Sequence, residues 1–313
     1  MGQVSRLIYA GTPQTAVPPL RRLIADGHEI VAVLTRPDAP LGRKRVLTPS
    51  PVAQEAAAHG LPVIKATRID DETHEAIAAL DAELAVVVAY GGLIPRRTLD
   101  AVQRGWVNLH FSLLPLLRGA APVQHALIQC HDITGASVFL LEEGLDTGPV
   151  LGMMTEAVRP EDTTGTLLER LSEAGSELLS QAVVGYLAGQ VTPVAQSGEP
   201  TFAPKLGRED GLVDFRQAAK AVHGRIAGVT PEPGAYTHLD DAVLKLGAVA
   251  LVPEVSDLEP GELRVEPGKR PRVLVGTGSH AVALGQVQPA GKKMMAAADW
   301  ARGLHDNTKV RLG

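Results

Sequence analysis

The chain has 313 residues, of which 45% are hydrophobic and 21% charged, so it is a folded globular protein long enough for two domains. The net charge of −5 gives no general affinity for polyanions, and the single cysteine, Cys130, excludes a disulfide within the chain and favours a reducing compartment. No signal-peptide pattern and no apolar run of about 18 residues is present, so we expect a cytoplasmic protein without a membrane span.

Apolar strands alternate with helical patterns through the first 190 residues. Strands are predicted at 7–11, 30–34, 61–64, 84–89, 106–111, 136–142 and 150–158. Helices are predicted after Thr12, which can cap the first one, and then at 52–59, 71–80, 97–102, 119–128 and 163–187. Buried strands separated by amphipathic helices are typical of a parallel α/β sheet.

Residues 36–51 interrupt this alternation. The segment is rich in proline and surrounds the basic triplet Arg43, Lys44 and Arg45, so we predict a loop of about 15 residues. Loops of that length are usually functional or mobile.

A second change of pattern begins at residue 189. Residues 189–204 are rich in Gly, Pro, Ser, Thr and Gln, which predicts an interdomain linker. Beyond it, short apolar runs at 243–246, 248–252, 263–265, 273–275 and 281–287 predict a small all-β barrel. Residues 269–313 hold eight Lys or Arg against two Asp or Glu, so the barrel carries a local basic excess.

Two polar clusters could carry chemistry. Asn108 and His110 point to the same side of one predicted strand, where an amide and an imidazole can face one reacting carbon. A single strand histidine alone is more often structural. Asp146 lies in an Asp-Thr-Gly turn that could also be ordinary turn chemistry, and could orient and charge-stabilise His110. An aspartic protease would need a second such site in an all-β setting.

Several common motifs are absent from the sequence. It has no Gly-rich phosphate loop, no dinucleotide-binding fingerprint, no His-Glu-x-x-His and no paired cysteines, so neither a nicotinamide cofactor nor a metal is expected.

The clusters resemble the folate-dependent formyltransferases. The resemblance lies in Asn-Leu-His-Phe-Ser-Leu-Leu-Pro at 108–115, Arg-Gly-Ala-Ala-Pro at 118–122 and Gly-Leu-Asp-Thr-Gly at 144–148. Further segments are similar to the methionyl-tRNA formyltransferases in particular, at 10–13, 36–38, 47–52, 88–91, 161–167, 203–206 and 288–294.

The resemblance implies an α/β fold with a Rossmann-like catalytic domain over 1–189, a linker over 190–205 and an OB-fold-like, tRNA-binding barrel over 206–313. It maps the catalytic roles onto Asn108, His110 and Asp146. It places the folate at Ala89, Tyr90, Gly91, Ser112, Leu113, Leu114, Pro115, Glu142 and Gly144.

The implied reaction moves the formyl group of 10-formyltetrahydrofolate to the α-amine of methionine on initiator tRNA. Asn108 and a protonated His110 would donate to the oxyanion, while the group that takes the amine proton stays open. The implied tRNA contacts are Arg43, Lys44, Arg45, Lys205, Lys292, Lys293 and Arg302. The protein is expected to act as a monomer.

Three departures from the family pattern flank the catalytic residues: Phe111, Leu116 and Leu117. They leave open a formyltransferase that acts on a small amine such as a nucleotide sugar, although the basic loop and barrel argue against it. A non-catalytic RNA-binding protein is the alternative from another class, and the intact catalytic residues argue against that.

Overall fold

The computed structural model describes residues 4–42, 44–268, 271–304 and 310–313, and it divides into two compact units. The first unit runs through Gly119 and adds Gly135–Glu156 and Leu168–Phe202. The second unit combines Ala120–Thr134, Ala157–Leu167 and Ala203–Gly313. Both units are therefore assembled from separate stretches of the chain.

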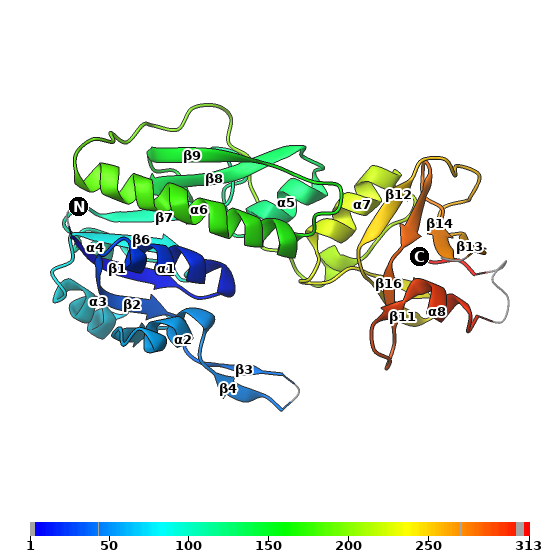
Figure 1. The fold of residues 1–313 in the computed structure, drawn as a ribbon, viewed down its shortest axis with the longest axis horizontal. Helices are drawn as coiled ribbons and strands as arrows, with labels where there is room; N and C mark the ends of the chain where they lie inside the picture. The colour runs from blue at the N-terminus through cyan, green and yellow to red at the C-terminus, as the bar shows by residue number, and fades with distance from the viewer. Residues whose placement is uncertain (1–3, 43, 269–270, 305–309) are drawn as a thin grey trace. The chain divides into compact units, whose positions relative to one another are not determined.

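The first unit is built, among its described residues, on a seven-stranded sheet (Figure 1). Across the sheet the strands are β5 (Val63–Lys65), β2 (Glu29–Thr35), β1 (Arg6–Gly11), β6 (Leu84–Val88), β7 (Trp106–His110), β8 (Ile133–Leu140) and β9 (Val150–Ala157). The first five are parallel, and β8 is antiparallel to β7. The parallel sheet predicted from the apolar strands is confirmed.

The order of the parallel strands sets the place for a ligand. The chain moves outward from β1 to β2 and β5, then returns to β6 and β7 on the other side of β1. This is the arrangement of a Rossmann-like sheet, in which the connections leave β1 and β6 in opposite directions and open a crevice at their carboxyl ends.

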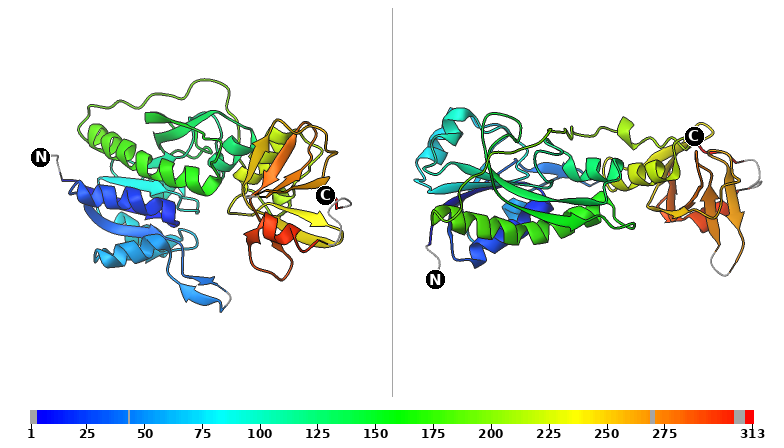
Figure 2. Two further views of the ribbon diagram at one scale, coloured as in Figure 1. Left: turned by 45° about the vertical axis from the view of Figure 1, so that its right-hand side comes forward. Right: turned by 90° about the horizontal axis from the view of Figure 1, so that it is seen from above.

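Helices cover both faces of this sheet (Figure 2). They are α1 (Val17–Ala25), α2 (Pro51–Ala58), α3 (Asp71–Ala78), α4 (Arg96–Leu99) and α6 (Thr164–Leu187). The α6 and α1 helices share one face, where the Ser180 hydroxyl donates to the Asp26 carboxylate at 2.6 Å. The other face packs Ile8 and Trp106 against Ile77 of α3 and Leu99 of α4.

The predicted capping role of Thr12 is wrong. A 3₁₀ turn (Gln14–Ala16) precedes α1, which begins only at Val17, and neither start has a side-chain cap. Instead the Thr12 hydroxyl donates to the Tyr90 carbonyl at 2.8 Å and accepts from the Arg36 amide at 3.3 Å. Thr12 therefore ties together the segments that follow β1, β6 and β2.

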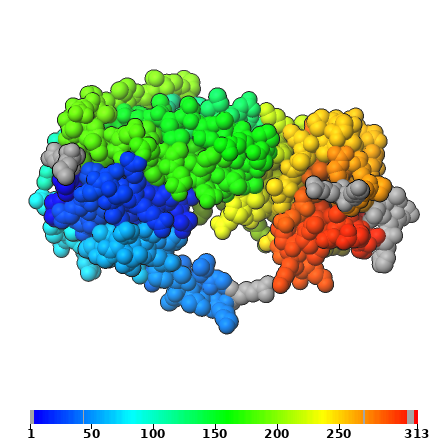
Figure 3. Space-filling view, viewed as in Figure 1, coloured from blue at the N-terminus to red at the C-terminus, as the bar shows by residue number. Residues whose placement is uncertain are grey.

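The predicted loop at 36–51 contains a hairpin of β3 (Ala39–Leu41) and β4 (Val46–Thr48), which stands out from its unit in Figure 3. Gly42 (φ 70°) and Arg45 (φ 49°) adopt the left-handed backbone that its turn requires. Both strands are exposed and three residues long, so they lack the apolar alternation by which strands are recognised.

The second unit contains, in its described part, two four-stranded antiparallel sheets, which confirms the small β domain. One sheet holds β10 (Tyr236–Leu239), β11 (Ala242–Leu246), β16 (Gln286–Pro289) and β17 (Met295–Ala296). The other holds β12 (Val249–Val252), β15 (Ala281–Leu284), β14 (Arg272–Val275) and β13 (Leu263–Glu266). The helices α5 (Pro122–Ile128), α7 (Ala219–Gly228) and α8 (Ala297–Ala301) complete it.

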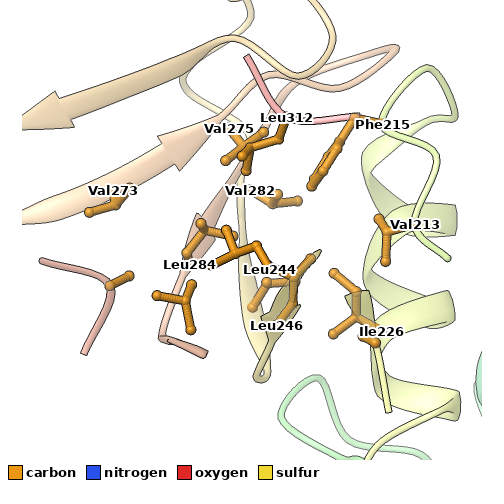
Figure 4. Packing of buried hydrophobic residues seen from close by; sticks show 14 of the residues in the cluster. Val213, Phe215, Ile226, Leu244, Leu246, Val273, Val275, Val282, Leu284 and Leu312 are labelled. Atoms are coloured by element: carbon orange, nitrogen blue, oxygen red, sulfur yellow. The ribbon is translucent and has the colours of Figure 1, made fainter. Parts of the chain in front are cut away.

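The predicted strand at 281–287 is two strands that belong to different sheets. Before Gly285 the chain pairs with β12 and β14, and after it with β11 and β17. Strands that switch sheets at a glycine form the corners of such β domains. The side chains between the sheets form one apolar core, which includes Leu244, Val282 and Ile226 of α7 (Figure 4).

Two glycines let α7 lie close against α5. A Cβ atom on Gly224 would come within 2.6 Å of the Leu127 carbonyl oxygen, and one on Gly228 within 2.7 Å of the Gln124 carbonyl oxygen. The pair is spaced four residues apart and therefore lies on one face of the helix. The 120–134 segment is thus an integral part of the second unit.

No helix in the described part of the chain is both long and apolar enough to cross a membrane.

Truncation of the core residue Leu244 to alanine is expected to lower the free energy of unfolding by about 2–5 kcal/mol, because it leaves a cavity between the two sheets. Urea denaturation measures the change. Leu251→Ala is the matched control, since that leucine is 39% exposed. Equal losses in the two variants would contradict the assigned core.

Candidate active site

Strands β1, β6 and β7 end at one edge of the sheet in the first unit. Because Asn108 and His110 lie two residues apart on β7, they point to the same face, which is also the face of Trp106. His110 is the last residue of its strand and is only 6% exposed, whereas Asn108 is half-buried. Within the described residues the Asn108 side chain makes no hydrogen bond, so its amide can donate to a ligand.

Each ring nitrogen of His110 faces a fixed group. Its Nε2 lies 3.0 Å from the Leu117 carbonyl oxygen, which can only accept, so Nε2 carries the proton in the neutral ring. Its Nδ1 lies 3.8 Å from Oδ2 of Asp146. That distance exceeds a hydrogen bond but allows a strong charge interaction once the ring is protonated.

The Asp146 carboxylate is also held by a backbone hydrogen bond. The Gly119 amide donates to its Oδ2 at 2.7 Å, so the loops at 112–119 and 141–149 meet at this oxygen. The three predicted catalytic residues thus come from two neighbouring segments of one unit.

The backbone around His110 is strained. Leu117 has φ 57° and Asp146 has φ 50°, the left-handed region that side chains other than glycine seldom adopt. Such residues cost roughly 1–3 kcal/mol each and persist only where their surroundings hold them. Both residues that face the His110 ring are therefore kept in place by their neighbours.

Burial lowers the pKa of His110 from its ordinary value, and the Asp146 charge and the Leu117 carbonyl offset this only in part. The resting ring is therefore neutral, with an unprotonated Nδ1. This favours His110 as the acceptor of a proton over the oxyanion donor expected from the sequence.

The predicted folate residues lie around the ends of β6 and β7. Ala89 and Gly91 are exposed with left-handed backbones, while the Tyr90 ring is buried in the core, so only the backbone of Tyr90 can meet a ligand. In the next loop Leu113 and Pro115 are half-buried. Glu142 and Gly144, which follow β8, are both exposed.

Two predicted folate residues have structural contacts instead. The Ser112 hydroxyl donates to the Leu116 carbonyl at 2.6 Å, which closes the loop on itself. Leu114 is 5% exposed, and its amide donates to the Ser137 hydroxyl at 3.1 Å. These residues shape the loop rather than offer free groups to a ligand.

The three residues that depart from the family pattern differ in how far they are buried. Phe111 and Leu117 are buried at 7% and 1% exposure, and Leu116 is 40% exposed. Leu117 contributes its backbone carbonyl, and not its side chain, to His110.

The predicted tRNA contacts that the structure describes are exposed, and they fall into both units. Lys44 and Arg45 lie at the turn of the β3–β4 hairpin, whereas Arg43 lies outside the described residues. Lys205, Lys292 and Lys293 belong to the second unit, as does Arg302, which forms an ion pair with Asp299. Among the described residues the lysines and Arg45 have no acidic partner and are free to meet phosphates.

A contact that sequence reasoning missed involves Gln196. Its side chain bridges Arg118 and the backbone of Asp146, although the residue lies in the segment predicted as a linker. No local pattern marks it, because its partners lie 50 and 78 positions away.

A cavity of about 730 Å³ in the second unit contains none of the predicted catalytic residues. Its His223 is half-buried, and burial lowers the pKa of that ring. The described residues contain no group of three or more His, Cys, Asp or Glu that could hold a metal ion.

Comparison with known proteins agrees with this geometry. Residues 5–183 match the family described as Formyl transferase, and residues 205–305 match its C-terminal domain. The methionyl-tRNA formyltransferase of Paenarthrobacter aurescens (strain TC1) is 60% identical over 97% of this chain and 99% of its own length. That of Arthrobacter sp. (strain FB24) is 58% identical over 95% and 96%.

The chain belongs to the methionyl-tRNA formyltransferase family. The motifs that carried the resemblance therefore identified the family correctly.

Solved structures share the formyltransferase fold at low identity. A Helicobacter canadensis N-formyltransferase, in complex with folinic acid and dTDP-3-aminofucose, has a TM-score of 0.69 at 14% identity, covering 92% of this chain and all of that one. HypX from Aquifex aeolicus in complex with tetrahydrofolic acid has a TM-score of 0.66 at 18% identity. The match covers 97% of this chain but only 47% of HypX, so the chain spans about half of that protein.

The His110 ring is expected to titrate below its ordinary pKa of about 6.5. Asp146→Asn should lower this pKa further, because it removes the negative charge that stabilises the imidazolium. NMR of labelled imidazole rings measures the His110 titration in the wild type and in the variant. An unchanged or raised His110 pKa in Asp146→Asn would contradict the assigned pair.

Proposed function

We propose that this chain transfers the formyl group of 10-formyltetrahydrofolate to the α-amino group of methionine on initiator tRNA. The observation that carries the proposal is the near full-length identity of 60% to a methionyl-tRNA formyltransferase, with Asn108, His110 and Asp146 gathered at the end of β7. The related HypX structure with tetrahydrofolic acid supports a folate donor in this fold.

The reaction begins when the neutral amine attacks the formyl carbon and forms a C–N bond. The carbonyl oxygen becomes an oxyanion, and the free amide of Asn108 donates to it as the charge develops. Nδ1 of His110 accepts the amine proton, which creates an imidazolium beside the Asp146 carboxylate. The intermediate collapses when the bond to N10 of the folate breaks and N10 takes this proton.

The folate site is proposed at the carboxyl ends of β1, β6 and β7. The segments Ala89–Gly91, Ser112–Pro115 and Glu142–Gly144 border this edge. The exposed backbone at Ala89 and Gly91 can pair with the polar edge of a pterin ring, while Leu113 and Pro115 offer apolar surface.

The tRNA contacts are proposed for the β3–β4 hairpin, through Arg43, Lys44 and Arg45, and for Lys205, Lys292, Lys293 and Arg302. The division of the sequence into a catalytic domain (1–189), a linker (190–205) and a tRNA-binding domain (206–313) belongs to the same proposal, with residues 120–134 and 157–167 packed into the second compact unit. So do a cytoplasmic location and action as a monomer.

Purified protein with 10-formyltetrahydrofolate is expected to formylate Met-charged initiator tRNA far better than Met-charged elongator tRNA or free methionine. Acid-gel separation of formylated and unformylated Met-tRNA measures the rates. Asn108→Ala should slow transfer by roughly 100- to 1000-fold through loss of an oxyanion donor. Transfer to an amino sugar nucleotide, with none to Met-tRNA, would replace the proposal by the small-amine alternative.

Substitution of Lys44 and Arg45 by alanine is expected to raise KM for tRNA and to leave the affinity for folate unchanged. Each cation that neutralises a phosphate contributes about 1 to the slope of log affinity against log salt, so loss of both should reduce that slope by about 2. Arg21→Ala is the matched control, because that exposed arginine pairs with Glu55 on the first unit. An unchanged salt slope would argue against docking of the hairpin on tRNA.

A further inference from the structure

The segment predicted as a linker is bound to both loops of the active site. Val194 exchanges two backbone hydrogen bonds with Val150, the first residue of β9. Further along, Thr201 accepts from the Leu117 amide with its hydroxyl at 2.8 Å and from the Arg118 amide with its carbonyl at 2.8 Å. The stretch from Val194 to Thr201 therefore runs along the loops at 141–149 and 112–119.

Gln196 lies between these two attachments and links both loops through one side chain. Its Nε2 donates to the Asp146 carbonyl at 2.7 Å and to the Gly148 carbonyl at 2.9 Å. Its Oε1 accepts from Arg118, through the guanidinium nitrogens Nη2 at 2.6 Å and Nε at 3.2 Å. All of these partners belong to the first unit.

The chemistry of the partners requires an amide at this position. Carbonyl oxygens can only accept and a guanidinium can only donate, so the bridge needs a donor and an acceptor on one planar group. A glutamate could keep the hydrogen bonds from Arg118 but would repel both carbonyls. An apolar side chain of similar length would form none of these bonds.

We infer that Gln196 is a positioning residue for formyl transfer, which holds the Asp146 backbone so that its carboxylate stays beside His110. Asp146 has a left-handed backbone, and the Gln196 bond to its carbonyl is one of the contacts that maintain it. The bond from Gly119 fixes the carboxylate at the other end of the residue. The rate measurement for this inference rests on the proposed function. The expected effect of Gln196 on the pKa of His110 does not rest on it.

The experiment compares Gln196→Met and Gln196→Glu with the wild-type chain. Both variants should lower kcat by roughly 10- to 100-fold, because a small displacement of a catalytic group has effects of that size, while KM for folate and tRNA changes little. Gln190→Glu is the matched control on the same segment, since its side chain is exposed and it should keep the wild-type kcat.

A second readout separates positioning from general stability. In Gln196→Met the Asp146 carboxylate is no longer held beside the His110 ring, so its charge stabilises the imidazolium less. NMR should therefore place the His110 pKa below that of the wild type, with the melting temperature nearly unchanged. Among the described residues, Asp146 is the group whose charge raises the pKa of this ring. This measurement needs no substrate and stands even if wild-type protein fails to formylate Met-tRNA.

The inference is overturned by either of two results. If Gln196→Met and Gln196→Glu keep the wild-type kcat, the bridge has no role in the reaction. If kcat falls but the His110 titration coincides with that of the wild type, Gln196 does not act through Asp146.

Discussion

The active site depends on the buried imidazole of His110. Its two ring nitrogens face the Leu117 carbonyl and the Asp146 carboxylate, and other residues keep these two groups in position. Because His110 is buried, bulk solvent cannot replace a missing partner, so the Leu117 carbonyl and the Asp146 carboxylate must be kept in place by other contacts. Leu117 and Asp146 both have left-handed backbones, and the stretch from Val194 to Thr201 holds both of them, through Thr201 and Gln196 respectively. The loops around β7 serve this single requirement.

The arrangement divides the chemistry between the two polar residues of β7. The side-chain amide of Asn108 is free to donate a hydrogen bond to the developing negative charge. The Nε2–H group of His110 already donates to the Leu117 carbonyl. The remaining nitrogen, Nδ1, faces the carboxylate that would stabilise it after proton transfer. The sequence placed both residues on one face of a strand but could not decide their roles, because protonation depends on burial and on the partner of each nitrogen.

Predictions from the sequence succeeded where a local pattern encodes burial. The continuous apolar runs predicted the parallel strands, and the alternation along β7 predicted that Asn108 and His110 point the same way. They failed where one side chain can make either of two different contacts. The Thr12 hydroxyl can cap a helix or join strand ends, and only the position of Tyr90 decides between these. Gln196 gave no signal at all, because its partners are distant in the chain.

The second unit is assembled from segments that are far apart in the chain, and this affects the order in which its parts are synthesised. The α5 helix is synthesised about 90 residues before α7, the helix against which its carbonyls pack through Gly224 and Gly228. At roughly 5–20 residues per second on the ribosome, α5 must wait several seconds for its partner. A carboxy-terminal fragment cut at the linker would lack α5 and leave that glycine face uncovered. The order of segments along the chain is therefore a poor guide to which pieces can be exchanged between relatives.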